Sequence, residues 1–275
     1  MKIGIHTYAW GSHFGNDTLY IIDCCRELGM DYVEFPLMEI DAFDPVAVKA
    51  RLGDLEPTTS ARIPRREWDV ASDDPQEREW GRTFLRRCVE KTAAVGAQVF
   101  SGNFYVGAEK ENKPTQAEWE RSVEAVRMTA RLAADLGVRI GIEAVSRFAN
   151  NLVNTARQAV RFVEDVGESN VFVHLDSFHM AYEERDLPAA IRFVGGRLGY
   201  FHMAGNDRGR PGDDDLFDWD AIFSAFKEIG FDDYLGFEGF DMTCGHIYRD
   251  IIGDPMDFAR ESRAYALKML EKHGF

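Results

Sequence analysis

Short apolar runs alternate with longer amphipathic segments along the whole chain. Each short run is rich in Val, Ile, Leu, Phe and Tyr, which is the composition of a buried β-strand. In the longer segments the apolar residues recur at helical spacing. The predicted strands cover residues 2–8, 31–37, 58–63, 97–104, 138–145, 170–178, 198–205 and 234–240. The predicted helices lie within residues 17–29, 44–55, 75–96, 115–137, 155–167, 187–196, 218–230 and 254–274.

This alternation indicates the class of fold. Strands that alternate with helices pair in parallel and are joined by right-handed crossovers. Eight strand–helix units in 275 residues favour an α/β protein of the (β/α)8, or TIM-barrel, type. A doubly wound open sheet is the alternative, but no GxGxxG motif follows the first strand to support it. No Pro- or Ser-rich linker divides the chain, so we expect a single domain over residues 1–275.

Glycines and loops support the same interpretation. Several predicted helices end in a glycine suited to the position after a helix, namely Gly29, Gly96, Gly137, Gly167 and Gly230. The longest predicted loops, near 109–114 and at 206–217, both follow strands. In a barrel such loops lie on the active face, where specificity is usually set.

Composition narrows the possible partners and location. The chain carries 32 basic and 47 acidic residues, a net charge of −15, which disfavours binding to nucleic acid or an anionic membrane. The sequence has no signal-peptide pattern at its start, and no run reaches the ~18 apolar residues of a membrane span. The four cysteines show no CxxC spacing, so we expect reduced thiols in a cytoplasmic protein.

Three carboxylates and one imidazole lie near the ends of successive predicted strands. They are Glu143, Asp176, His202 and Glu238, spaced 33, 26 and 36 residues apart, about one strand–helix unit each. In a parallel barrel these side chains would meet at one mouth. A buried carboxylate without a partner is costly, and a single strand acid alone could pair with an arginine. Four such residues together favour a divalent cation: Mn²⁺, Mg²⁺ or Co²⁺ rather than a thiolate-seeking metal.

Further residues are candidates for contacting a substrate. His179 follows Asp176 by three residues and is either a substrate ligand or a surface-loop histidine. Arg208 lies in a Gly-rich loop, where it either reaches a substrate hydroxyl or remains solvated. His6, Tyr8 and Trp10 lie at the end of the first predicted strand and are candidates for the pocket wall. His174 is interpreted as a core residue.

The candidate residues suggest chemistry on a polar, oxygen-rich small molecule. A metal bound to a ketone and its neighbouring hydroxyl acidifies the carbon-bound proton between them. Acids on opposite sides of that carbon would remove the proton from one face and return it to the other, which is epimerisation. One acid on a single face, relaying the proton between adjacent carbons, would give aldose–ketose isomerisation instead.

The sequence resembles the ketose 3-epimerases, the D-tagatose and D-allulose 3-epimerase group of the xylose-isomerase-like barrels. The resemblance runs along most of the chain and is sharpest between 138 and 240. The stretch VHLDSFHM is close to the family's Leu-Asp-Thr-Phe-His-Met signature. The segments that carry the resemblance are 67–75, 142–160, 173–180, 200–212 and 236–240.

The resemblance implies roles for the residues at these positions. It implies that Glu143, Asp176, His202 and Glu238 bind the metal. Glu143 and Glu238 would also be the acid–base pair at C3, acting through a cis-enediolate. His179 and Arg208 would contact the O1 and O2 end of a ketose. Family members usually assemble as dimers or tetramers, so a homo-oligomer is expected.

The chain departs from the family pattern near the substrate. Ala149 stands where the family places a second acid that binds substrate, and Arg62, Arg65 and Arg66 stand where the family is mostly small or apolar. These departures leave open a different ketose, an acidic sugar or an isomerase. A DNA-repair nuclease on the same barrel is disfavoured by the net charge of −15 and by the presence of only seven histidines. A non-catalytic binding module is the remaining alternative.

Overall fold

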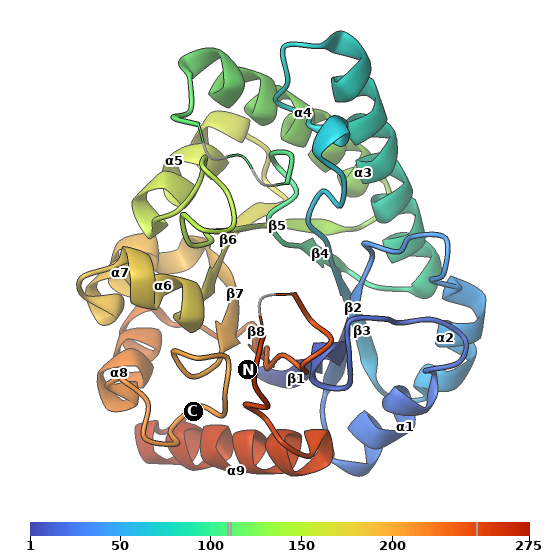
Figure 1. Cartoon of the computed structure of the whole chain (residues 1–275). Coiled ribbons are helices and arrows are strands. Elements are labelled where there is room, and N and C mark those ends of the chain that lie inside the picture. The colour runs from blue at the N-terminus through green and yellow to red at the C-terminus, as the bar shows by residue number, and fades with distance from the viewer. Residues whose placement is uncertain (109, 111, 246) are drawn as a thin grey trace.

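Eight parallel strands close into a barrel, and helices surround it (Figure 1). The computed structural model describes residues 1–108, 110, 112–245 and 247–275. The strands follow one another around the barrel in sequence order, and β8 pairs with β1 to close it. The predicted (β/α)8 fold is confirmed. The predicted loop near 109–114 includes Glu109 and Glu111, which lie outside the described residues.

The described elements have the following bounds. The strands are β1 (Lys2–His6), β2 (Tyr32–Pro36), β3 (Glu56–Ser60), β4 (Val99–Ser101), β5 (Arg139–Glu143), β6 (Val171–Asp176), β7 (Leu198–Met203) and β8 (Tyr234–Phe237). The α-helices are α1 (Tyr20–Glu27), α2 (Pro45–Leu52), α3 (Pro75–Val95), α4 (Gln116–Asp135), α5 (Ala156–Val166), α6 (Ser177–Glu183), α7 (Leu187–Val194), α8 (Trp219–Ile229) and α9 (Pro255–His273). Short 3₁₀ turns are η1 (Thr7–Ala9), η2 (Arg66–Trp68) and η3 (Gly195–Arg197).

The helix boundaries follow from local sequence signals. Helices α2, α3 and α9 each begin at an Asp-Pro pair, in which the aspartate accepts backbone N–H bonds and the proline occupies the first turn. Helices α4 and α5 begin with Thr capping boxes. The predicted terminal glycines adopt positive φ angles, as a left-handed cap requires: Gly29, Gly96, Gly137, Gly167 and Gly230.

Two elements differ from the sequence prediction. The run 170–178 was expected to be all strand, but β6 ends at Asp176 and α6 starts at the next residue. The carboxylate of Asp176 accepts a hydrogen bond from Phe178 N at 2.7 Å and so caps this short helix. Strand β4 has only three residues, because the chain leaves the sheet after Ser101.

The inside of the barrel is stacked in layers. A cluster of Tyr32, Val99, Phe172, Tyr200 and Tyr234 fills its amino-terminal half. The rings of Tyr200 and Tyr234 stack with centroids 5.5 Å apart. Side chains on one face of a strand recur every second residue, so a polar layer lies directly above this aromatic floor. The larger hydrophobic core lies between the strands and the surrounding helices.

Glycine makes room for the aromatic floor. A Cβ on Gly4 would lie 2.5 Å from the ring of Tyr32, and one on Gly236 would lie 2.6 Å from its hydroxyl. No larger residue fits either position without moving that ring. The floor therefore closes the barrel from below, and the polar layer above it opens only toward the carboxyl ends of the strands.

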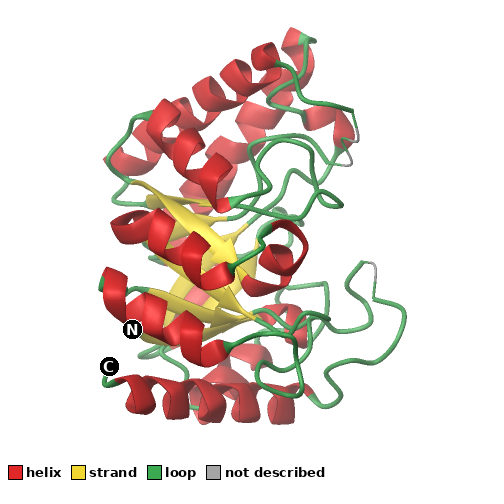
Figure 2. Ribbon diagram, turned by 90° about the vertical axis from the view of Figure 1, so that its left-hand side faces the viewer, coloured by secondary structure: helices red, strands yellow, loops and turns green. Residues whose placement is uncertain are grey.

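The long loops gather at that carboxyl end (Figure 2). Both chain termini lie at the opposite end, where the Met1 amino group pairs with Asp232. Among the described residues no helix has the length and apolarity needed to cross a bilayer. The four cysteines are free thiols: Cys24, Cys25, Cys88 and Cys244.

Candidate metal centre and active site

The four candidate metal ligands meet above the aromatic floor. Glu143 ends β5, Asp176 ends β6, His202 lies in β7, and Glu238 directly follows β8. One nitrogen or oxygen of each lies within 4.8 Å of the others. All four are buried, with exposed fractions of 8%, 0%, 1% and 8%. The barrel thus brings together in space the residues that the sequence spacing had singled out.

His202 shows how this group fits a cation. Its Nδ1 lies 3.5 Å from Glu238 Oε2, 3.8 Å from Asp176 Oδ2 and 4.0 Å from an oxygen of Glu143. The atom is buried and has no hydrogen-bond partner among the described residues. A buried polar atom without a partner is costly, and hard divalent cations prefer carboxylate oxygens with an occasional imidazole. The donor set therefore fits a divalent metal.

A fourth carboxylate holds the other nitrogen of His202. Glu34 of β2 is fully buried, and its Oε2 lies 2.7 Å from His202 Nε2 and accepts a hydrogen bond from the Tyr200 hydroxyl at 2.6 Å. Burial alone would raise the pKa of the Glu34 carboxyl. The charge and the hydrogen bond of His202 outweigh this effect, so the pKa is lowered to about 2. The sequence analysis missed this residue, although an acid inside the apolar run DYVEFPL was a visible signal.

Arg208 lies inside the site rather than in solvent. It is 2% exposed, and its Nη1 lies 2.5 Å from Asp176 and 2.6 Å from Glu238. Its guanidinium packs over the rings of Phe178 and Phe240, at 4.2 Å and 4.5 Å from their centroids. The backbone of Arg208 has a φ of 72°, uncommon outside glycine. The tight turn after β7 therefore directs the guanidinium group of Arg208 onto the carboxylates of Asp176 and Glu238.

His179 lies on a helix and not in a surface loop, which was one of the two alternatives left open by the sequence. It lies on α6, where its Nδ1 accepts a hydrogen bond from Ser146 N at 3.1 Å. Its Nε2 lies 3.0 Å from Arg208 Nη2. Burial and the neighbouring arginine lower the pKa of His179 to about 3, so the imidazole is neutral. The structure thus places His179 and Arg208 side by side next to the four candidate ligands.

Negative charge is crowded in this space. Burial and the neighbouring Glu238 raise the pKa of Glu143 well above its usual value. Burial would also raise the pKa of Glu238, but Arg208 and His202 outweigh it and lower that pKa. Burial acts to lower the pKa of His202, yet its carboxylate neighbours raise it overall. Additional positive charge would relieve this crowding, which again fits a bound cation.

The residues after β1 form the side of the site nearest β8. The ring of Tyr8 lies 4.0 Å from that of His6 and 5.3 Å from that of Phe240. His6 is buried and its Nε2 lies 2.9 Å from Ser60 Oγ. Trp10 is partly buried against the core. Within the described part of the chain its ring makes no aromatic contact or hydrogen bond with the four candidate ligands.

His174 lies one layer below the ligands, as its prediction as a core residue implied. Its Nδ1 lies 2.8 Å from Ser101 Oγ, and its ring packs 4.3 Å from that of His202. Burial lowers its pKa well below the usual value, so it is neutral. His174 therefore packs against the ring of His202 on the side toward the aromatic floor.

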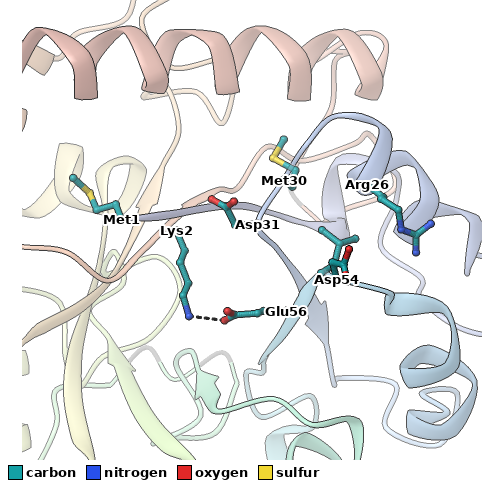
Figure 3. Close-up of a pocket in the computed structure, with 8 residues that line it drawn as sticks. Met1, Lys2, Arg26, Met30, Asp31, Asp54 and Glu56 are labelled. Carbon is teal, nitrogen blue, oxygen red and sulfur yellow. Dashed lines mark hydrogen bonds and ion pairs between the residues drawn. The ribbon is translucent and has the colours of Figure 1, made fainter.

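A separate cavity lies at the amino-terminal end of the barrel, away from the four candidate ligands. It measures about 450 Å³ and is lined by Lys2, Asp31 and Glu56, with Arg26 at its edge (Figure 3). Lys2 Nζ donates to Glu56 Oε2 at 2.6 Å across it. In TIM barrels the amino-terminal face contributes to stability, and the chemistry takes place at the carboxyl ends of the strands. The four-residue cluster at the carboxyl ends is therefore the candidate active site.

The sequence and the fold match known proteins. The family model for xylose isomerase-like TIM barrels matches residues 22–269. A ketose 3-epimerase from Arthrobacter globiformis is 33% identical, with 99% of this chain and 100% of that protein covered. An L-ribulose 3-epimerase from Mesorhizobium japonicum is also 33% identical, over 96% and 92% of the two chains.

A solved structure agrees over nearly the full length. The D-allulose 3-epimerase from Methylomonas sp. in complex with D-allulose superposes with a TM-score of 0.93 at 26% identity, covering 98% of this chain and 97% of that one. The chain is thus a member of the xylose isomerase-like TIM barrels. Within that class it belongs to the ketose 3-epimerase family and is a carbohydrate epimerase.

Proposed function

We propose that this enzyme epimerises a ketose at C3 with the help of a divalent metal. The observation that carries the proposal is the meeting of Glu143, Asp176, His202 and Glu238 around the unpartnered Nδ1 of His202. The relatives named as ketose 3-epimerases support the same reaction for this chain. The sugar bound in the D-allulose 3-epimerase complex supports a small-molecule sugar as substrate.

The four residues would hold the metal through three carboxylates and the Nδ1 of His202. This donor set supports Mn²⁺, with Mg²⁺ and Co²⁺ as alternatives. When bound, the cation polarises the ketone and its neighbouring hydroxyl and so acidifies the proton on C3. Asp176 and His202 hold their positions through other bonds: Asp176 caps α6, and His202 is held by Glu34.

Glu143 and Glu238 are the proposed acid–base pair. They come from β5 and β8, which are separated in the barrel by β6 and β7, so they approach the site from different sides. One glutamate removes the C3 proton from one face of the substrate, giving a cis-enediolate. The other returns a proton to the opposite face, which inverts the configuration at C3.

The remaining candidates would bind and orient the sugar. His179 and Arg208 form one contacting group and would donate hydrogen bonds to the O1 and O2 end of the ketose. Tyr8, packed against Phe240, and Trp10 would line the wall on the β1 side. Substrate bound in this way would have C3 between the two glutamates.

Replacing either glutamate tests the proposal. We expect Glu143→Gln and Glu238→Gln each to lower kcat by about 10²–10⁴-fold, because a glutamine cannot transfer the proton. Turnover would be followed with candidate ketoses in D₂O by NMR, with thermal unfolding and Mn²⁺ content measured for each variant. Near-wild-type turnover in either variant would refute the mechanism.

The position of the deuterium label separates the two reactions that the barrel supports. Label at C3 with inversion indicates epimerisation. Label at C1 or C2 without C3 inversion indicates the alternative, a metal-dependent aldose–ketose or sugar-acid isomerase. The two carboxylates on different sides of the site favour the first outcome.

A further inference from the structure

A small cavity lies among the loops at the carboxyl end of the barrel. Its volume is about 20 Å³, and its walls come from the loops after β3, β4 and β5. The polar side chains of the wall are those of Arg62, Asn103 and Asn150, next to the methyl group of Ala149. No acidic side chain of the described residues lines it. A cavity of this size holds about one water-sized group.

Hydrogen bonds attach the walls of this cavity to Glu143. The backbone N of Glu143 donates to Gly102 O at 3.1 Å, one residue before Asn103. The Tyr105 hydroxyl donates to Glu143 O at 2.8 Å, and Asn150 Nδ2 donates to that hydroxyl at 3.0 Å. These bonds tie the loops that form the cavity to the end of β5, where Glu143 lies.

The wall formed by the loop after β4 is firmly placed. Gly107 N donates to the buried Asp69 at 2.8 Å, and Lys110 pairs with the same carboxylate at 2.6 Å. A Cβ on Gly107 would lie 2.7 Å from Asp69 Cβ, so only glycine allows this close approach. The cavity is thus bounded by a preorganised wall, which lowers the cost of ordering on binding.

Arg62 is the charged group of this wall. It is exposed and makes no ion pair or hydrogen bond with another residue in the described ranges. Its neighbour Arg65 instead faces Glu67 at 3.8 Å and lies over the Trp68 ring at 5.0 Å. Residues 61–66 carry three arginines and no acid, in a chain whose net charge is −15. The part of the cavity wall next to residues 61–66 is therefore locally positive.

The donors that face the cavity are available for a ligand. The side chain of Asn150 is already used, because its Oδ1 accepts from Leu152 N at 2.8 Å and its Nδ2 binds Tyr105. The amide of Asn103 has no hydrogen-bond partner in the part of the chain that the structure describes. Arg62 and Asn103 therefore offer N–H donors on the cavity wall, which also includes the uncharged Ala149. Arg62 follows β3 and Arg208 follows β7, on opposite sides of the eight-stranded barrel, so Arg62 lies across the barrel mouth from the proposed O1 and O2 contact.

We propose that Arg62 recognises an anionic group at the end of the ketose farthest from the carbonyl, either a carboxylate or a phosphate. A guanidinium binds such oxygens with paired, charge-assisted hydrogen bonds. Asn103 adds one donor, and the absence of an acid from the described wall removes a repulsive contact. The inference rests on the proposed C3 epimerisation and narrows its substrates to acidic ketoses.

The test compares matched substrates on the full-length, Mn²⁺-loaded protein. The substrates are one ketohexose, its 6-carboxylate and its 6-phosphate, and the readout is kcat/KM for C3 exchange in D₂O. We expect an anionic form to exceed the neutral sugar by about 10- to 100-fold, the range of a charge-assisted hydrogen bond. The two anionic arms identify which group is recognised.

Variants assign that preference to one side chain. Arg62→Gln should reduce the ratio of anionic to neutral kcat/KM toward one, mainly through KM, whereas the matched control Arg65→Gln should keep the wild-type ratio. Ala149→Glu, which places a negative charge in the wall, should lower the ratio as well. Thermal unfolding of each variant checks that the fold is kept.

The outcomes separate the two proposals. A wild-type ratio near or below one, or an unchanged ratio in Arg62→Gln, overturns the inference about Arg62. If the neutral ketose still exchanges at C3 in that case, the proposed function stands. If neither the neutral nor the anionic ketoses exchange at C3, the proposed function falls and the inference falls with it.

Discussion

The imidazole of His202 is held on both sides by carboxylates. Its Nε2 contacts Glu34, and its Nδ1 faces the three carboxylates of the candidate metal centre. A hydrogen bond on one nitrogen fixes the orientation of the ring and makes the other nitrogen a better ligand. Tyr200 binds the same Glu34 oxygen and keeps that carboxylate in place. Glu34 is therefore a positioning residue for the metal centre.

Replacing Glu34 should weaken metal binding without removing a ligand. We expect Glu34→Gln to lower the affinity for Mn²⁺ by about 10- to 100-fold, the usual effect of losing such a partner. Isothermal titration of the metal-free protein with Mn²⁺ measures this directly, independently of turnover. Glu56→Gln is the matched control, because Glu56 pairs with Lys2 at the opposite end of the barrel. Wild-type affinity in Glu34→Gln would show that Glu34 does not position His202.

At the scale of single residues, the sequence predicted the candidate metal ligands but not the residue that supports His202. Glu143, Asp176, His202 and Glu238 could be singled out because each lies near the end of an apolar run, at the same level of a parallel barrel. The support of His202 comes from Glu34 across the barrel, 168 residues away. Local patterns contain no information on which inward-facing polar side chains meet. Only the closed barrel shows that Glu34 and His202 face each other.

Helix α6 carries His179 and is fastened to the loop after β5. The side chain of Glu183 accepts bonds from Arg147 N at 2.7 Å, from its Nε at 2.9 Å and from its Nη2 at 2.8 Å. The same loop donates Ser146 N to His179. The ion pair thus sets the distance between the end of β5, with Glu143, and the helix that carries a proposed substrate ligand.

Breaking this ion pair should affect both stability and substrate binding. We expect Glu183→Gln to lower the free energy of unfolding at pH 7 by about 1–2 kcal/mol, because the glutamate is 5% exposed and its partner is solvated. It should also raise KM more than it lowers kcat. The matched control is Glu228→Gln, which breaks an exposed pair with Arg192 of the same forked geometry and should therefore cost less stability than Glu183→Gln.

The effect of Glu183 depends on pH. Burial would raise its pKa, but the bonds from Arg147 lower it overall. A carboxylate with a lowered folded-state pKa contributes stability above its unfolded pKa of about 4.3 and loses it as the pH falls through the folded value. The difference between wild type and Glu183→Gln should therefore be constant near neutral pH and shrink below about pH 4.3. A difference that grows on acidification would contradict this assignment.

The helices and strands could be predicted where capping residues and hydrophobic periodicity indicated the same boundaries. The Asp-Pro starts and glycine ends fixed most helices, because their signals are local. Helix α6 was missed because its residues continue the apolar run of β6, and its start depends on Asp176 acting as a cap. The short β4 was extended in the prediction, because apolar residues in 97–104 continue into a buried loop.

At the scale of the whole molecule, the metal should stabilise the fold. Three carboxylates and His202 are buried close together, and a ligand that binds only the native state shifts unfolding by mass action. At 100 times its Kd, Mn²⁺ contributes about 2.7 kcal/mol, or a rise in Tm of roughly 5–10 °C for a chain of this size. Calorimetry with Mn²⁺ and with EDTA measures the shift.

A ligand variant controls for non-specific effects of the ion. Asp176→Asn should lose most of the Mn²⁺-dependent rise in Tm, since the amide is a poorer ligand than the carboxylate. An equal rise in both proteins would mean that Mn²⁺ acts elsewhere on this acidic molecule. A fall in Tm with EDTA in wild type alone would support the cluster as the binding site.

The pairing of β1 with β8 has a consequence for when the candidate cation site is completed. Lys2 lies opposite Tyr234, and Ile5 opposite Phe237, so the barrel closes by joining segments more than two hundred residues apart. Glu238 follows the strand that makes this closure and is the last of the four ligands in the chain. Pairing between such distant segments is slow, because the entropy of closing the long loop between them must be paid first. A nascent chain therefore has no complete cation site until its last strand is in place, and metal capture reports the finished barrel.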